Sequence, residues 1–156
     1  MKKDSENSSV FSVFQKGTPK IKKKLNGKIF SLLTGGGGNK NYWHWLFDVL
    51  PRINILEKNI DINEIDFFLF PDLNERFQKE SLDLLDIPHN KRVSSITHRH
   101  IQTDLTITVD HPYVVKNDPS IEIQNLPNWI LKYLRDKFFN HENNNKFPDK
   151  FFIDRS

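Results

Sequence analysis

The sequence contains no cysteine, which excludes disulfides, thiolate metal ligands and thiol nucleophiles and fits a reducing compartment. Long apolar runs are also missing, since no run approaches the roughly 18 to 20 residues that span a bilayer. The polar opening MKKDSENSS is not followed by the apolar core of a signal peptide. We therefore expect a cytoplasmic protein without a membrane span.

Glycine is scarce and concentrated: 6 glycines occur in 156 residues, and those at 35–38 are consecutive. Their spacing matches neither the GxGxxG dinucleotide pattern nor a P-loop, because no Gly-Lys-Ser/Thr follows. Glycines ahead of a helix start allow close backbone approach, and free N–H groups there can hold an anion. Gly37 and Gly38 are therefore candidate substrate-binding residues, with a flexible loop as the alternative.

Aromatic and basic residues are what the chain has in quantity. Phe alone occurs 13 times and aromatics make up 12% of the chain, which favours one folded domain over disorder. The formal charge is +3, and much of it lies in one short segment. That segment is either a solvated surface or a patch for anionic lipid headgroups or a lipid diphosphate at the inner face of a membrane. It comprises Lys16, Lys20, Lys22, Lys23, Lys24 and Lys28.

Nucleic acid is not an expected partner. A nucleic-acid interface would need exposed aromatic side chains for base stacking beside the basic residues. Phe67, Phe68 and Phe70 lie in a continuous apolar run and are typical of a core strand. The aromatic residues therefore indicate packing and not a stacking platform.

Strand and helix signals alternate along the chain. Asn41 is a candidate helix cap, and Pro51 should kink or restart the helix that follows. The strand at 66–70 is apolar on both faces, as in a sheet covered by helices on each side, whereas 105–109 should turn its odd-numbered residues inward. The expected strands are 29–33, 66–70, 92–96, 105–109 and 150–154, and the expected helices are 41–56, 74–85 and 127–139.

The two later helices should each bury one side. In the first of them Phe77, Leu84 and Leu85 are expected on one side. In the second, which a first-turn proline opens, the buried stripe is expected to comprise Ile130, Leu131, Leu134 and Phe138.

This alternation predicts an α/β fold with a parallel sheet of Rossmann-like type. We divide the chain into a basic, loosely ordered segment at 1–27, a Rossmann-like domain at 28–140, and a linker with one further strand at 141–156. The chain ends two residues after that strand, before the helix that would cover it. A fragment of a longer enzyme is therefore expected.

One group of polar residues stands beside the glycine run. His44, Asp48 and Arg52 are four residues apart, so on a helix they share a face. Asp48 could then fix the imidazole tautomer, and Arg52 could offer a bidentate fork to phosphate. A solvated stripe with helix ion pairs is the alternative. His98 and His100 lack a third ligand at useful spacing, so no metal site is predicted.

The run NYWHWLFDVLPRI at 41–53 resembles the signature of glycosyltransferase family 61. The similarity continues in order through the strand that ends at Pro71, the FQKE segment at 77–80 and the LPNW segment at 126–129. The terminal FFIDRS at 151–156 resembles a further strand of the family, after which a second arginine and an Asn-Glu pair normally follow. The resemblance covers roughly residues 28–156.

The resemblance implies an inverting transferase of the two-domain GT-B type, of which this chain would be the N-terminal half. Such an enzyme moves a sugar from a nucleotide-sugar donor to a glycan acceptor, here in capsule or surface polysaccharide biosynthesis, and the acceptor could be lipid-linked. No cofactor and no metal are implied, and Asp61-Ile62-Asn63 narrowly misses an Asp-x-Asp. The C-terminal domain that normally holds the nucleotide would be missing, so the isolated chain is expected to be inactive.

The resemblance also assigns roles to individual residues. His44 and Asp48 are the candidate catalytic residues, since a histidine is suited to general base catalysis near neutral pH. The candidate substrate-binding residues are Gly37, Gly38, Asn41, Tyr42, Arg52 and Arg155, the two arginines as stabilisers of a diphosphate leaving group. The alternative function is an inactive remnant or an acceptor-binding module.

Overall fold

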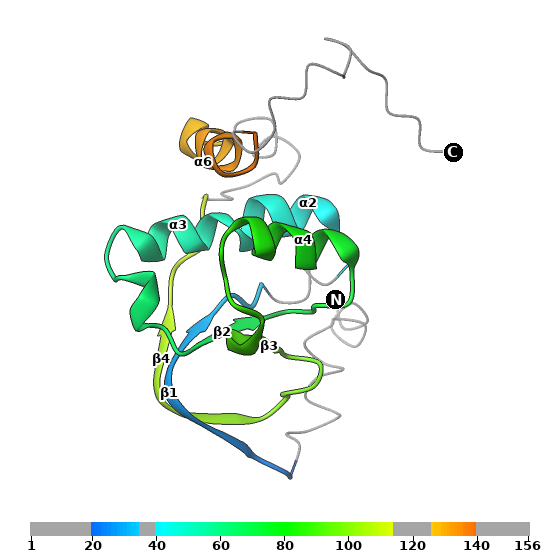
Figure 1. Ribbon diagram of the computed structural model, residues 1–156, viewed down its shortest axis with the longest axis vertical. Helices are drawn as coiled ribbons and strands as arrows, with labels where there is room; N and C mark the ends of the chain where they lie inside the picture. Colours follow the sequence, from blue (N-terminus) through cyan, green and yellow to red (C-terminus); the bar gives the residue numbers. More distant parts are fainter. Residues whose placement is uncertain (1–19, 35–39, 114–125, 140–156) are drawn as a thin grey trace, which may run out of the picture.

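The computed structural model describes residues 20–34, 40–113 and 126–139. The expected strand at 150–154, the glycines at 35–38 and Arg155 lie outside these ranges. Figure 1 shows the strands β1 (Lys23–Ser31), β2 (Phe67–Phe70), β3 (Arg92–Ser94) and β4 (Ile101–Thr108). The helices are α2 (Tyr42–His44), the π-helix η1 (Trp45–Val49), α3 (Pro51–Glu57), the 3₁₀-helices η2 (Ile62–Glu64) and η3 (His89–Lys91), α4 (Arg76–Leu84) and α6 (Asn128–Phe138).

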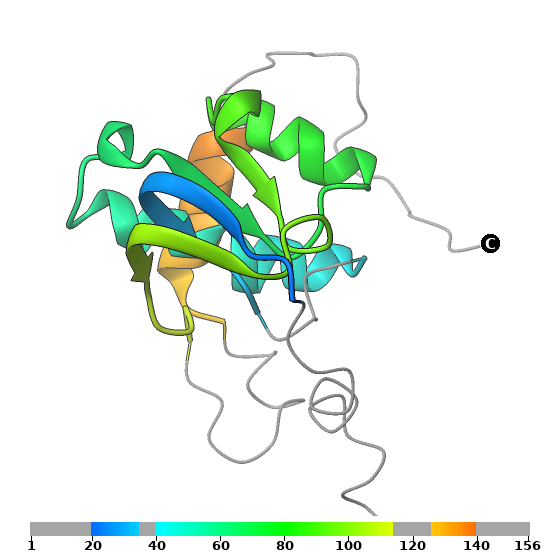
Figure 2. The same cartoon turned by 90° about the horizontal axis from the view of Figure 1, so that it is seen from below.

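The four strands form one sheet in the order β3-β2-β1-β4, and every neighbouring pair is parallel. The predicted α/β class with a parallel sheet is confirmed. Phe30 on β1 is paired with Phe68 on β2 and with Ile107 on β4. The chain thus moves outward from β1 to β3 and then returns to the other side of β1 (Figure 2).

Within the described residues, helices pack against one face of the sheet. Phe68 and Phe70 belong to the core cluster beneath the helices, whereas Phe67 and Leu69 do not. The expectation that helices cover both faces at 66–70 is therefore not met here. The connection from β3 to β4 spans only 95–100, whereas a helical crossover between parallel strands takes a dozen residues or more.

Strand β1 starts earlier than expected, at Lys23 instead of 29. Its first residues pair with β4, and the register shifts between Leu25 and Lys28. Gly27 sits in this bulge with φ of +122°, a conformation that favours glycine. Its N–H donates to Asp104 at 2.7 Å. The bulge thus lets the lysine-rich start of β1 pair with β4, although its lysine content made a strand there hard to predict.

Two lysines of the basic segment take part in the fold. Lys23 Nζ donates to the carbonyl of Thr97 at 2.9 Å, and Lys28 Nζ pairs with Glu64 at 2.7 Å. The Glu64 contact raises the pKa of Lys28. These two lysines are therefore not simply part of a solvated run.

The first helical segment follows the predicted punctuation. Asn41 caps it, because its side-chain oxygen accepts from the N–H groups of Trp43 and His44. Pro51 is the first residue of α3, so the helix restarts there as expected. Between them, Leu50 N–H donates to Trp45 O at 3.0 Å, which makes a π-turn. In a regular α-helix a proline ring clashes with the carbonyl four residues earlier. This clash is a physical reason for the wider π-turn just before Pro51.

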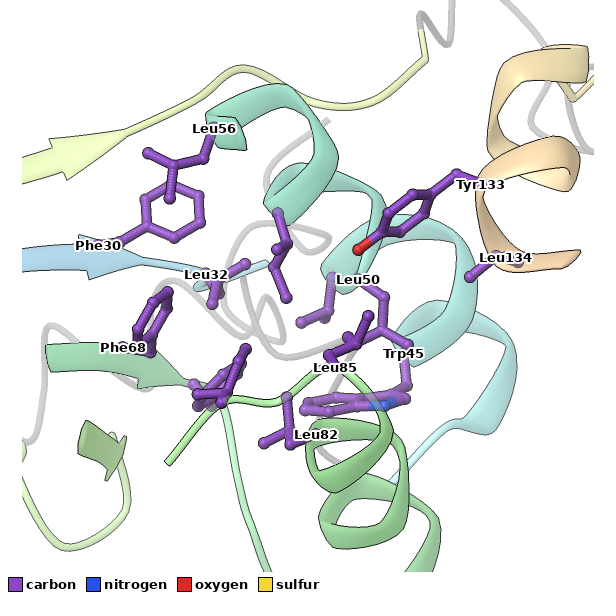
Figure 3. Packing of buried hydrophobic residues seen from close by; sticks show 14 of the residues in the cluster. Phe30, Leu32, Trp45, Leu50, Leu56, Phe68, Leu82, Leu85, Tyr133 and Leu134 are labelled. Atoms are coloured by element: carbon purple, nitrogen blue, oxygen red, sulfur yellow. The ribbon is translucent and has the colours of Figure 1, made fainter. Parts of the chain in front are cut away.

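The hydrophobic core lies between the sheet and the helices (Figure 3). Trp45 is fully buried, packs on Phe70 and Phe77, and donates its indole N–H to Ser81 Oγ at 2.8 Å. Fully burying a large apolar side chain contributes about 1.5 to 3 kcal/mol. The aliphatic members of the hydrophobic core include Leu32, Leu50, Ile53, Leu56, Ile65 and Leu82.

Helix α6 lies beyond α3 and α4, on the side away from the sheet (Figure 1). It buries Ile130, Tyr133 and Leu134, whereas Leu131 is 43% exposed. The predicted stripe was therefore wrong at Leu131 and missed Tyr133. The shift arises because α6 packs on other helices, so its buried face is set by α3 and α4 and not by maximal hydrophobicity.

Two further burial predictions need correction. On the predicted side of α4, Leu85 is buried and Phe77 packs on the core, but Leu84 is 40% exposed and borders a groove under α6. Gln78 and Leu82 are buried in addition. In β4, Ile107 and Val109 pack on the core as expected, but Leu105 is 49% exposed. β4 is an edge strand, and the helical layer does not reach over its middle. No helix in the described ranges combines the length and apolarity that a membrane crossing needs.

Candidate active site

The candidate site lies where the carboxyl ends of β1 and β4 meet. These strands are parallel neighbours, with Ser31 opposite Thr108 at their ends. β1 leads toward α2, and β4 leads into residues 109–113. Because β2 lies on one side of β1 and β4 on the other, the strand order reverses at this point. Parallel α/β sheets bind ligands preferentially outside such a switch point.

Asp48 is the centre of the site. It is only 6% exposed, and each oxygen of its carboxylate has a partner. Oδ2 lies 2.6 Å from His44 Nδ1, and Oδ1 accepts the hydroxyl of Tyr113 at 2.7 Å. A buried carboxylate is costly unless it is hydrogen-bonded, and these two contacts satisfy it from two separate segments of the chain.

His44 has the geometry of an oriented base. Its side chain is 40% exposed, so the ring reaches the surface while its Nδ1 faces a buried carboxylate. The 2.6 Å contact with Asp48 favours the tautomer that carries hydrogen on Nδ1. The lone pair is then on Nε2, which is the atom that can accept a proton from a substrate.

His111 is a second histidine beside the same carboxylate. Its Nε2 is 3.6 Å from Asp48 Oδ1, and its Nδ1 is 2.7 Å from the carbonyl oxygen of Tyr113. Its ring meets that of Tyr113 edge to face, with centroids 4.5 Å apart. His111 thus braces the turn that presents the tyrosine hydroxyl to Asp48.

Arg52 is placed differently from its predicted role. It is only 8% exposed, and its Nη1 donates to the carbonyl of Leu33 at 2.8 Å. Burial lowers the pKa of Arg52, while the charges of Asp48 and Asp110 act to raise it. Its Nε is buried and has no partner among the described residues. The guanidinium therefore joins α3 to the end of β1, and it offers little of its fork to solvent.

The other predicted site residues do not join this network. Asn41 uses its side-chain oxygen as the helix cap. Tyr42 is 57% exposed and meets Phe77 edge to face at 5.0 Å, on the border of the groove under α6. Gly37, Gly38 and Arg155 lie outside the described residues. Of the predicted set, the structure brings together His44, Asp48 and the nearby Arg52.

Sequence reasoning missed Tyr113 and His111. Both follow β4 in the segment DHPY, and Tyr113 is 65 residues from Asp48. The available signal was a cluster of polar residues after a strand, since carboxyl ends of parallel strands share one edge. That signal required knowing that β4 adjoins β1.

An apolar groove lies apart from this network, between α4, α6 and the start of α2. It has a volume of about 650 Å³, within the range of small-molecule pockets. Tyr42, Phe77, Leu84, Leu131 and Phe138 are among its lining residues. Its lining includes none of the residues that contact Asp48.

Among the residues that the structure describes, no group of three or more histidine or acidic side chains is arranged to hold a metal ion. Comparisons with family models, curated proteins and solved structures found no match to this chain.

Proposed function

We propose that this chain belongs to a glycosyltransferase and supplies the general base that activates a glycan acceptor. The observation that carries the proposal is the His44–Asp48 dyad, in which a buried carboxylate orients a partly exposed imidazole. Its place beside the switch point of a parallel sheet, and the similarity of 41–53 to glycosyltransferase family 61, support the same function.

The proposed reaction is a single displacement with inversion. An acceptor hydroxyl gives its proton to His44 Nε2 while its oxygen forms a bond to the anomeric carbon of the donor. The bond from that carbon to the nucleoside diphosphate breaks, and the leaving group takes the electron pair. The Asp48 carboxylate stabilises the imidazolium that forms, as in other base and orienter pairs.

The donor side of the proposal rests on the resemblance. In two-domain GT-B transferases a second Rossmann-like domain holds the nucleotide sugar, and the acceptor enters between the domains. We propose that the enzyme is cytoplasmic, peripheral to the membrane, and acts in capsule or surface polysaccharide biosynthesis. Arg52 would act here by holding the end of β1 in place.

Turnover of site variants tests this proposal. The protein that carries this chain is incubated with a panel of nucleotide sugars and oligosaccharide acceptors, and release of nucleoside diphosphate is measured. We expect His44→Ala to lower kcat by about 10²- to 10⁴-fold, the usual contribution of a general base. Because the ring is partly exposed and lies outside the core cluster, the melting temperature should change far less than turnover.

His89→Ala is the matched control, because the side chain of His89 is 79% exposed and lies away from Asp48. It should keep normal turnover. Wild-type turnover in His44→Ala, or a loss that only follows the unfolded fraction, would show that the dyad is structural. Saturable acceptor binding that requires His44, without transfer from any donor, would instead identify an acceptor-binding module.

A further inference from the structure

Asp48 is held from two directions that the sequence does not connect. His44 lies one helical turn before it, whereas Tyr113 follows β4, 65 residues later. Each partner takes a different oxygen of the carboxylate: Oδ2 faces His44 and Oδ1 faces the tyrosine hydroxyl. The rotation of the carboxylate about its last bond is therefore fixed by Tyr113 as much as by the helix.

Tyr113 can act in this pair only as a hydrogen-bond donor. Burial, followed by the hydrogen bond to Asp48 and the charge of Asp48, raises the pKa of Tyr113 well above its ordinary value. The hydroxyl thus keeps its proton at neutral pH and points it at Oδ1. It neither competes with His44 for a substrate proton nor adds negative charge to the site.

We propose that Tyr113 is a positioning residue for His44: by occupying Oδ1 it directs Oδ2 of Asp48 to His44 Nδ1 and holds the imidazole in the tautomer with Nε2 unprotonated. His111 assists, since its Nδ1 contacts the carbonyl oxygen of Tyr113 at 2.7 Å and fixes the turn. The end of β4 thereby completes a base that the first helix alone would leave loosely oriented. The role in catalysis, though not the tautomer control, rests on the proposed function.

A purely structural role of the Tyr113 hydroxyl has different consequences from a positioning role. If the Tyr113 hydroxyl only stabilises the fold, its removal lowers the unfolding free energy and leaves the His44 ring unchanged. If it positions Asp48, its removal also changes the proton distribution between Nδ1 and Nε2 of His44. The tautomer ratio therefore separates the two roles.

The test is ¹⁵N NMR of the histidine rings in the 156-residue chain, about two pH units above the ordinary histidine value so that neutral imidazole dominates. In the wild type, His44 should be mostly the Nδ1–H tautomer. In Tyr113→Phe the share of the Nδ1–H tautomer of His44 should fall and that of the Nε2–H tautomer should rise. Tyr133→Phe, which removes a hydroxyl without a partner in the described ranges, should leave the ratio as in the wild type.

A second measurement needs no variant. The wild-type chain should show a slowly exchanging Nδ1 proton on His44 and a slowly exchanging hydroxyl proton on Tyr113, with a nuclear Overhauser effect that places both beside Asp48. Rapid exchange of both protons in the folded wild type would overturn the proposal, as would an unchanged tautomer ratio in folded Tyr113→Phe.

Turnover separates this proposal from the proposed function. Tyr113→Phe should lower kcat roughly 2- to 10-fold, the scale of one hydrogen bond, with KM unchanged. A shifted tautomer in a protein that transfers no sugar would uphold the positioning role and reject the proposed function. Transfer that needs His44, together with an unshifted tautomer in Tyr113→Phe, would do the reverse.

Discussion

Tyr113 and Tyr133 lie in two regions that bury polar groups in opposite ways. At the carboxyl edge of the sheet, the Tyr113 hydroxyl donates to Asp48 at 2.7 Å. On α6, Tyr133 is 5% exposed, and its hydroxyl is buried without a partner among the described residues. An unsatisfied buried hydroxyl costs about 1 to 3 kcal/mol.

The two regions differ because different forces assemble them. The carboxyl edge gathers charged and hydrogen-bonding groups from several segments, and the position of each one depends on the others. The α6 contact relies on apolar burial at Ile130 and Leu134, with Lys137 near Glu57 at 3.6 Å on the rim. An interface stabilised by apolar burial tolerates one hydroxyl without a hydrogen bond. A polar network changes its geometry when one of its groups is removed.

The largest expected effect on stability concerns the apolar region. Leu134→Ala should lower the unfolding free energy by about 2 to 5 kcal/mol, because Leu134 is 9% exposed and its truncation leaves a cavity in the core cluster. Urea unfolding measures this loss.

Leu131→Ala is the matched control on the same helix, since Leu131 is 43% exposed. It should cost less than about 1 kcal/mol. Equal losses at both positions would show that α6 packs on a different face in solution, and the contrast between the two regions would then need revision.

An intermediate effect is expected at alkaline pH. The pKa of Tyr113 is raised by burial and by Asp48, and that of Tyr133 is raised by burial and by the charge of Glu57. Both hydroxyls must be neutral in the folded state, so their contribution to stability is fully present below the unfolded value of about 10. It falls as the pH rises from there toward the folded pKa values.

Alkaline denaturation curves of three proteins check this sign. The wild type should lose stability above about pH 10, and Tyr113→Phe and Tyr133→Phe should each reduce the steepness with which stability falls as the pH rises.

Asp48→Asn tests the cause assigned to Tyr113. This variant removes the Asp48 charge and the carboxylate acceptor, so it should allow Tyr113 to ionise at lower pH, as followed by tyrosinate absorbance. A tyrosinate titration in Asp48→Asn that matches the wild type would contradict the assigned cause.

The smallest effect is expected from Tyr133→Phe at neutral pH. Removing a hydroxyl without a partner should change stability by roughly zero to 1 kcal/mol, toward greater stability, because the lost desolvation cost is partly offset by the void that the oxygen leaves. Tyr113→Phe, which removes a made hydrogen bond, should lose about 0.5 to 1.5 kcal/mol. The two changes in stability need not be equal in size. Destabilisation by Tyr133→Phe as well as by Tyr113→Phe would indicate that the Tyr133 hydroxyl has a partner.

Local features were the part of the fold that sequence reasoning predicted well. The cap at Asn41, the restart at Pro51 and the succession of helices and strands were confirmed, because each depends on the chemistry of neighbouring residues. The early start of β1 was missed, since it requires pairing with β4 and a bulge at Gly27.

The candidate site divides in the same way. The four-residue spacing of His44 and Asp48 determines that a helix can bring them together, and the structure confirms the contact. Only the tertiary structure decided that Tyr113 and His111 complete the site and that Arg52 is buried against Leu33. A helical contact follows from spacing along one element, whereas a contact across 65 residues depends on which strands become neighbours, and that is set by how the whole core packs.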